Sequence, residues 1–76
     1  MVQSEKFIPA VSIVIPTLNE AENIYPLLTR IFEVAQTSGL SIEVVIVDDS
    51  STDGTRDQVR GWQTTHPVTM VCHPRT

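Results

Sequence analysis

The sequence has few of the residues on which several common classes of protein depend. It holds one cysteine, Cys72, so an internal disulfide framework and a cysteine-ligated zinc site are both excluded. Five lysines and arginines stand against nine aspartates and glutamates, which argues against nucleic acid as the main partner. No apolar run approaches the roughly 20 residues that span a bilayer, and no secretory signal peptide is visible. We therefore expect a cytoplasmic protein.

The remaining composition favours one small packed domain. The chain has 76 residues, and 41% of them are hydrophobic. That is enough for a core, although a chain of this size buries only about 60–65% of its unfolded surface. Residues 1–10 are mixed and polar, and we interpret them as an N-terminal arm. Residues 11–76 carry the patterns that predict regular structure.

Three apolar runs predict β-strands, at residues 11–15, 42–47 and 68–72. The second run shows no alternation, which is typical of a strand buried on both faces, as in a parallel sheet. Pro16 should end the first strand, because proline has no N–H for the ladder. Cys72, at the end of the third run, is expected to be a small buried residue.

Two patterns predict helices between these strands. Apolar residues at spacings of three and four predict a helix over residues 20–38, with Asn19 as its N-cap. A weaker pattern predicts a helix over residues 54–64, with Trp62 in the core. This helix should end before the dipeptide of His66 and a proline, and we expect that histidine at the surface.

The element order is therefore β-α-β-α-β. Crossovers between parallel strands are right-handed almost without exception, so this order predicts an α/β fold with a three-stranded parallel sheet. Such a unit is one half of a doubly wound nucleotide-binding sheet. We expect the chain to be an N-terminal fragment of a longer protein, with an uncovered sheet edge through which it could self-associate.

Two adjacent carboxylates follow the central apolar run. Asp48 and Asp49 stand at its carboxyl end, where open α/β sheets bind ligands, and we expect both to emerge from the core there. Carboxylates at this place can accept hydrogen bonds from a base or a ribose, or hold a divalent cation. Asp53, in the turn that follows, is predicted to cap a helix.

Other functions fit the acidic stretch less well. The residues from Asp49 to Gly54 are spaced like the start of a calcium-binding loop, but Arg60 stands where that loop needs a bidentate glutamate. Residues 47–50 resemble the acidic pocket of a phosphorelay receiver domain, which needs an aspartate where this chain has His73. The dinucleotide fingerprint, the phosphate loop and the nucleophile elbow are absent. A receiver-like domain and a non-catalytic nucleotide-binding module remain as alternatives.

Two segments together resemble the family 2 inverting glycosyltransferases, most closely the branch of dolichyl- and polyprenyl-phosphate mannose synthases. They are VSIVIPTLNE over residues 11–20 and VIVDDSSTDGT over residues 45–55, with a helix between them. The resemblance runs from Val11 to Arg75. It implies a GT-A, Rossmann-like fold and transfer of a hexosyl group from GDP-mannose or a UDP-sugar to a polyprenyl-phosphate or similar acceptor.

The resemblance also implies a set of nucleotide-binding residues. Glu20 would accept from the ribose or base, and Asp49 would lie against the base with Asp48 in support. Leu18 stands where the family commonly has tyrosine. The full set is Pro16, Leu18, Glu20, Val47, Asp48 and Asp49.

The resemblance implies further parts that this chain lacks. The full-length enzyme would use Mg²⁺ or Mn²⁺, held by residues outside this chain, and would reach the cytoplasmic face of a membrane through other parts. No catalytic residue is expected within the 76 residues, so we expect the isolated chain to be inactive.

Overall fold

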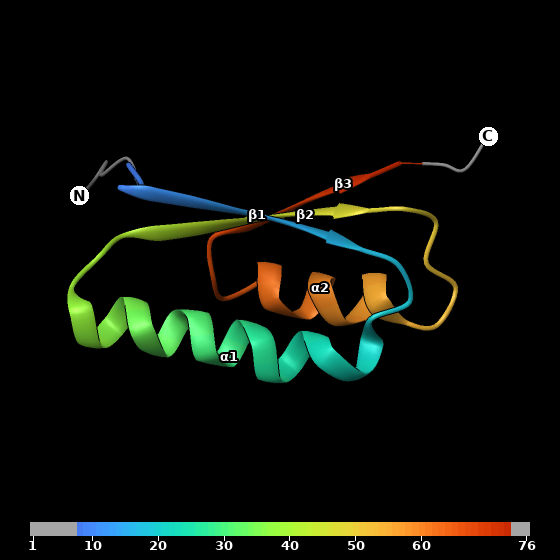
Figure 1. Ribbon diagram of the computed structural model, residues 1–76, viewed down its shortest axis with the longest axis horizontal. Helices are drawn as coiled ribbons and strands as arrows, with labels where there is room; N and C mark the ends of the chain where they lie inside the picture. The colour runs from blue at the N-terminus through green and yellow to red at the C-terminus, as the bar shows by residue number, and fades with distance from the viewer. Residues whose placement is uncertain (1–7, 74–76) are drawn as a thin grey trace.

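Residues 8–73 are described by a computed structural model, which confirms the predicted α/β class (Figure 1). The predicted arm is therefore seen only over residues 8–10, and Arg75 lies outside the described residues. The elements follow in the order β1 (Val11–Thr17), α1 (Ala21–Ser38), β2 (Ile42–Asp48), α2 (Thr55–Gln63) and β3 (Val68–Cys72).

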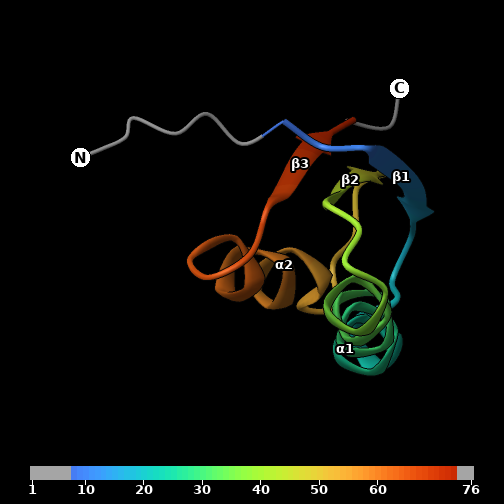
Figure 2. The same cartoon turned by 90° about the vertical axis from the view of Figure 1, so that its left-hand side faces the viewer.

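The three strands form a parallel sheet in the order β1-β2-β3. In its register, Val14 lies beside Val45, and Val45 lies beside Thr69. Each crossover thus moves the chain one strand further in the same direction across the sheet. Right-handed crossovers that advance in one direction place their helices on one side. Figure 2 shows α1 and α2 together below the sheet.

β1 is longer than predicted. It continues through Pro16 to Thr17, and Pro16 pairs in register with Val47. The expectation that Pro16 ends the strand is wrong because β1 is an edge strand. Proline is tolerated at a sheet edge, where a missing N–H need not remove a ladder hydrogen bond.

Both predicted helices are present with shifts of one residue at their ends. α1 begins at Ala21 and ends before Gly39, whose φ is 77° and whose N–H donates to the Ala35 carbonyl at 3.0 Å. Glycine adopts this left-handed conformation at little cost, which explains the end of the helix there. Across residues 8–73, neither helix combines the length and the apolar character that crossing a membrane requires.

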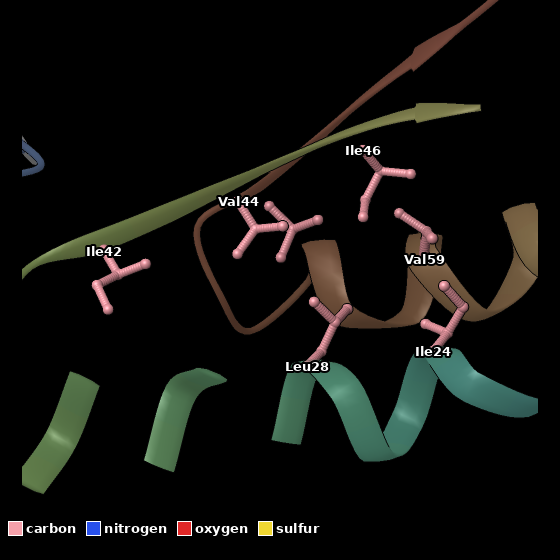
Figure 3. Packing of buried hydrophobic residues seen from close by; sticks show 7 residues of the cluster. Ile24, Leu28, Ile42, Val44, Ile46 and Val59 are labelled. Carbon is pink, nitrogen blue, oxygen red and sulfur yellow. The ribbon is translucent and has the colours of Figure 1, made fainter. Parts of the chain in front are cut away.

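The core lies between the sheet and the two helices (Figure 3). Side chains at every second position of β2 are buried, and those between them are only half-buried. The prediction that this strand is buried on both faces is wrong. Val45 and Val47 make the second face apolar, but no element of residues 8–73 covers it. On that face Val14 is 62% exposed and Val71 is 49% exposed. The buried hydrophobic residues are Ile24, Leu28, Ile42, Val44, Ile46, Val59 and Val68.

A cluster of aromatic side chains packs between α1 and the end of α2. Trp62 is half-buried and packs against the core, with its ring centroid 6.0 Å from that of Phe32. The His66 ring lies 4.6 Å from Phe32 and 4.8 Å from Trp62, so His66 is half-buried and the surface prediction is wrong. Cys72 is exposed, contrary to expectation, because β3 is an edge strand whose end projects beyond the helices (Figure 1).

Candidate nucleotide-binding site

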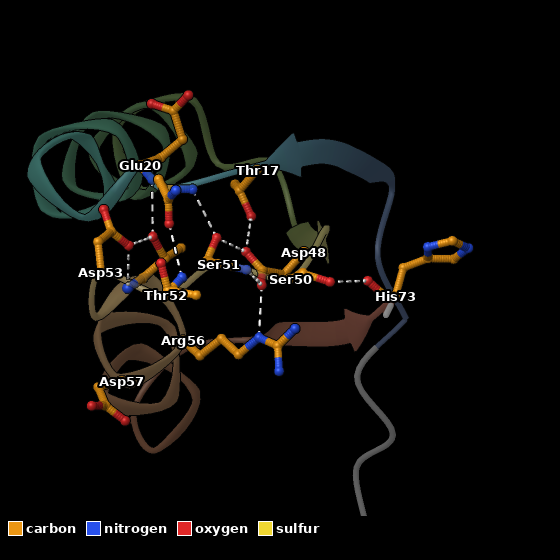
Figure 4. Close-up of polar contacts among 12 residues, drawn as sticks. Thr17, Glu20, Asp48, Ser50, Ser51, Thr52, Asp53, Arg56, Asp57 and His73 are labelled. Atoms are coloured by element: carbon orange, nitrogen blue, oxygen red, sulfur yellow. Dashed lines mark hydrogen bonds and ion pairs between the residues drawn. The ribbon is translucent and has the colours of Figure 1, made fainter. Parts of the chain in front are cut away.

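The two motifs meet at the carboxyl ends of β1 and β2. The β1–α1 corner, residues 18–20, lies against the β2–α2 turn, residues 49–54 (Figure 4). The Asp49 N–H donates to the Thr17 carbonyl at 2.9 Å, so the contact between the chain segments continues beyond the last paired residue of β2. The two segments that carry the family resemblance therefore lie side by side.

Asp48 is buried rather than exposed at the strand end. Its side chain has no exposed surface, because the residue continues the alternate positions of β2 that face the helices. Thr17 Oγ1 donates to Oδ1 at 2.7 Å, and the Ser51 N–H donates to Oδ2 at 3.0 Å. The Ser51 hydroxyl donates as well, and Arg56 Nε donates to Oδ2 at 2.7 Å. The expectation that Asp48 emerges from the core is wrong.

These hydrogen bonds decide the charge of Asp48. Burial alone would raise the pKa of this carboxyl, since it disfavours the charged form. Hydrogen bonds from Ser51, Arg56 and Thr17 outweigh burial and hold the pKa of Asp48 well below its usual range. The hydrogen bond between Arg56 and Asp48 also raises the pKa of Arg56 above its usual value. Asp48 is therefore a charged internal anchor that joins β1, the turn and α2.

The β1–α1 corner is held by the opposite turn. Asn19 has a φ of 53°, in the left-handed region that residues other than glycine adopt uncommonly. Its N–H donates to Ser51 Oγ at 2.8 Å, and its Oδ1 accepts from the Thr52 N–H at 2.8 Å. Asn19 was predicted to cap α1, and this is wrong: Glu20 occupies the cap position and makes no side-chain cap bond.

Glu20 lies at the outer end of this corner. Its N–H donates to Thr55 Oγ1 at 2.9 Å, while its Oε1 accepts from Asn23 Nδ2 at 2.8 Å. In Figure 4 the carboxylate of Glu20 points away from the hydrogen bonds around Asp48. It is therefore placed at the surface of the corner rather than within the internal network.

The other predicted site residues lie around this network. Pro16 and Val47 are partners in register and belong to the face of the sheet that the helices leave uncovered. Leu18, which follows β1, is 43% exposed. Asp49 is half-buried at the end of β2. The structure thus gathers five of the six residues around the strand ends and places Asp48 beneath them.

Asp53 was predicted to cap a helix; the cap position of α2 is Gly54, but the Asp53 side chain accepts hydrogen bonds from the first residues of both helices. Oδ1 accepts from the Thr55 N–H at 3.0 Å, at the start of α2. Oδ2 accepts from the Ala21 N–H at 3.1 Å, at the start of α1. The hydrogen bond from the Thr55 side chain is the main cause that lowers the pKa of Asp53.

Several participating residues were not found from the sequence. Thr17 contacts Asp48 from a distant part of the chain, whereas Ser51 and Arg56 contact it from the turn and helix that follow it. Arg56 did leave a local signal, because a cation in the first turn of a helix opposes the helix dipole. Its ion pair with buried Asp48 offsets that disadvantage.

Two hollows of the molecule lie beside the helices. They have volumes of about 610 and 540 Å³ and flank the aromatic side chains on the helical layer, with Tyr25, Trp62 and His66 lining both. None of the six predicted nucleotide-binding residues lines either hollow. The candidate site therefore rests on the strand ends and their loops, and it meets one of the hollows only at Gly54 of the β2–α2 turn.

Comparison with known proteins agrees with this arrangement. The family model described as glycosyl transferase family 2 matches residues 12–76. The chain therefore belongs to glycosyltransferase family 2. It is 41% identical over 61 residues to a dolichol-phosphate mannosyltransferase of Pyrococcus furiosus, covering 80% of this chain and 17% of that protein. It is 42% identical over 60 residues to the glycosyltransferase AglE of Haloferax volcanii, covering 78% and 19%.

A solved structure shows the same relationship. The mannosyltransferase PcManGT from Pyrobaculum calidifontis, in complex with GDP-Man and Mn²⁺, matches with a TM-score of 0.66 and 40% sequence identity. The match covers 90% of this chain and 20% of that one. This confirms the GT-A, Rossmann-like fold and the resemblance to the polyprenyl-phosphate mannose branch. The chain spans about a fifth of the length of these relatives.

The Mn²⁺ in that relative raises the question of a metal site here. Residues 8–73 hold no group of three or more His, Cys, Asp or Glu side chains that could bind a metal ion. Asp48 is unsuited to the task, since its carboxylate already accepts from Thr17, Ser51 and Arg56. The described residues do not fit a metal, and the prediction that its ligands lie elsewhere stays a prediction.

Proposed function

We propose that this chain supplies the nucleoside-binding part of a glycosyltransferase that moves a hexosyl group from a nucleotide-sugar to a polyprenyl-phosphate acceptor. The observation that carries the proposal is the hydrogen-bonded contact between the β1–α1 corner and the β2–α2 turn, which gathers both family motifs at the strand ends. Ligands of open α/β sheets bind at such strand ends. The names of the relatives, which include dolichol-phosphate and undecaprenyl-phosphate transferases, support the lipid-phosphate acceptor.

Within this proposal the six residues have two roles. Pro16, Leu18, Glu20, Val47 and Asp49 contact the nucleoside, and Leu18 offers an exposed apolar side chain to one face of the base. Glu20 offers a carboxylate at the surface, where it can accept from a ribose hydroxyl or a base N–H. Asp48 supports them from beneath through its contacts with Thr17 and Ser51.

We favour a GDP-sugar over a UDP-sugar as the donor. The support is the 40% identity to a mannosyltransferase solved with GDP-Man, over 90% of this chain. A divalent cation and the groups that activate the acceptor would come from residues outside this chain, so the chain alone should transfer no sugar. We place the longer protein in the cytoplasm, at a membrane that carries its lipid acceptor.

Two further expectations about partners stay predictions. Self-association would use an uncovered sheet edge, either that of β1 or that of β3, since both are edge strands within the described sheet. An absence of nucleic-acid binding follows from the acidic composition alone. Sedimentation of the chain at several concentrations, with and without DNA, tests both.

Calorimetry of the 76-residue chain with GDP and with UDP tests the proposed function. We expect saturable binding of GDP and weaker binding of UDP. Glu20→Gln should weaken GDP binding, whereas Glu22→Gln, two residues further on at an exposed position in the first turn of α1, should not. Absence of heat with both nucleotides, from a chain shown to be folded by circular dichroism, contradicts the proposal. Sugar transfer from GDP-mannose to dolichyl phosphate by the chain alone contradicts the expected inactivity.

A further inference from the structure

The side chain of Asp53 accepts hydrogen bonds from the first residues of both helices. Oδ2 accepts from the Ala21 N–H at 3.1 Å, and Oδ1 accepts from the Thr55 N–H at 3.0 Å and from the Thr55 hydroxyl. The oxygen of that hydroxyl accepts in turn from the Glu20 N–H at 2.9 Å. A continuous series of contacts therefore runs from the β2–α2 turn to the β1–α1 corner (Figure 4).

The N-terminal end of α1 is capped by residues from the β2–α2 turn and the start of α2. The first N–H groups of a helix have no partner within the helix, and the cap residue of α1, Glu20, makes no side-chain cap bond. Asp53 and Thr55 accept from two of the N–H groups at this end. A carboxylate near the positive end of a helix is also favoured by the helix dipole.

The corner itself needs support from outside. Asn19 holds a left-handed φ of 53°, and a residue other than glycine stays in this region only where its surroundings impose it. Asn19 bonds to Ser51 and Thr52, and the next two residues bond to Thr55 and Asp53. Residues 51–55 thus hold Asn19 and Glu20 of the corner and Ala21 at the start of α1.

We propose that Asp53 is a positioning residue of the donor site, which holds Glu20 and its neighbours in the shape that binds the nucleotide. Both of its oxygens are engaged by the protein, so the role proposed for Asp53 is exerted through the corner. Thr55 is fully buried. Its hydroxyl links Asp53 to the Glu20 N–H, so we assign it the same positioning role. This proposal rests on the proposed nucleotide-binding function.

Asp57 provides a matched control for Asp53. It is an aspartate in the first turn of α2, its side chain is 84% exposed, and its ion pair is with Arg60 on the same helix. Asp53→Ala and Asp57→Ala therefore remove the same group at positions four residues apart. Asp53→Asn retains one acceptor oxygen and serves if the alanine variant does not fold.

The experiment joins amide hydrogen exchange with calorimetry on the 76-residue chain. In Asp53→Ala we expect the Ala21 amide to exchange faster, while the Leu28 amide in the middle of α1 keeps its rate. GDP binding should weaken about fivefold, the size expected from the loss of one helix cap. Asp53→Asn should show a smaller change of both kinds. Asp57→Ala should change neither.

Thr55 supplies a rescue test for the same inference. Thr55→Val keeps the shape but removes the hydroxyl, so the Glu20 amide should exchange faster and GDP binding should weaken. Thr55→Ser retains the hydroxyl and should restore both properties toward those of the unmodified chain. A purely structural role of the buried methyl group would give the opposite order of the two variants.

Three results would overturn the proposal. They are an unchanged Ala21 amide in Asp53→Ala, an equal acceleration at Leu28 and Ala21, and a loosened corner with unaltered GDP binding. If the unmodified chain binds no nucleotide, the nucleotide function and the donor-positioning role fall together. The exchange data then still decide separately whether Asp53 holds the corner.

Discussion

Arg56 Nε lies 2.7 Å from Oδ2 of Asp48, and this ion pair joins the first turn of α2 to the last residue of β2. The Arg56 side chain is 30% exposed, whereas that of Asp48 has no exposed surface. A buried carboxylate that loses a charged partner is costly, because water cannot replace the missing donor. The pair therefore fixes how α2 sits against the sheet.

Arg56→Ala should lower the free energy of unfolding by about 1.5–3 kcal/mol, the range for a hydrogen bond to a charged group. Thr17 and Ser51 still donate to Asp48, which limits the loss. Urea unfolding of the 76-residue chain measures it. The control is Arg60→Ala, which removes only an exposed pair with Asp57 and should cost less than about 1 kcal/mol. Equal losses in the two variants would show that the Asp48 contact carries no special weight.

The free energy of unfolding should fall in acid. The pKa of Asp48 in the folded chain lies below its unfolded value of 3.8, so protonation favours the unfolded state. The contribution is complete above about pH 5 and is lost as the pH falls through 4 and below. Asp53, whose pKa is also lowered, adds to the slope in the same direction.

Urea unfolding between pH 7 and pH 3 measures this slope. Asp48→Asn should flatten it, since the variant has no carboxyl to protonate at this position. An unaltered slope in Asp48→Asn would assign the acid sensitivity to other carboxyls.

Neighbouring valines on β2 should respond differently to truncation. Val44 has no exposed surface and faces the helices, whereas Val45 is half-buried on the uncovered face. Val44→Ala should lower the free energy of unfolding by about 2–3 kcal/mol through lost burial and a residual cavity, and Val45→Ala by about 1 kcal/mol or less. Urea unfolding of the two variants tests this. Equal losses would indicate that something covers the second face in solution.

The two glycines of the α2 region should respond to alanine with opposite signs. Gly54 has a φ of 97°, which an alanine adopts only with strain, so Gly54→Ala should lower the free energy of unfolding by about 1–2 kcal/mol. Gly61 lies inside α2 with nothing within 4 Å of an added Cβ. Gly61→Ala should therefore raise it by about 0.5–1 kcal/mol. Thermal and urea unfolding measure both, and a destabilising Gly61→Ala would contradict the open space around that position.

Much of the fold was predictable because local patterns determine its elements. The spacing of apolar residues from Ile24 onward gave α1 to within one residue, and the order of elements gave the parallel sheet. The exposure of the sheet was not predictable, because valines on both faces of β2 conceal which face is covered. The end of β1 was also mispredicted. Proline ends a strand inside a sheet but is tolerated in an edge strand, and the sequence does not show that β1 lies at the edge.

The site was predictable in place but not in its contacts. The acidic motif located the strand end, and Asp53 was predicted to cap a helix. The contacts of Asn19 with Thr52 and of Asp48 with Thr17 join residues more than 30 positions apart, and no local pattern reports them. The burial of Asp48 follows from the alternation of buried positions along β2. The sequence prediction treated Asp48 and its neighbour Asp49 alike and so missed that alternation.

The shared side of α1 and α2 has a consequence for any strand that would extend this sheet. A parallel strand added next to β3 continues the present direction, and its right-handed connection would put another helix beside α2. A strand added next to β1 reverses the direction of travel, so its helix must land on the opposite side, over Val14 and Val45. The exposed valine surface is thus where the helices of a second layer would pack if the sheet were extended beyond β1.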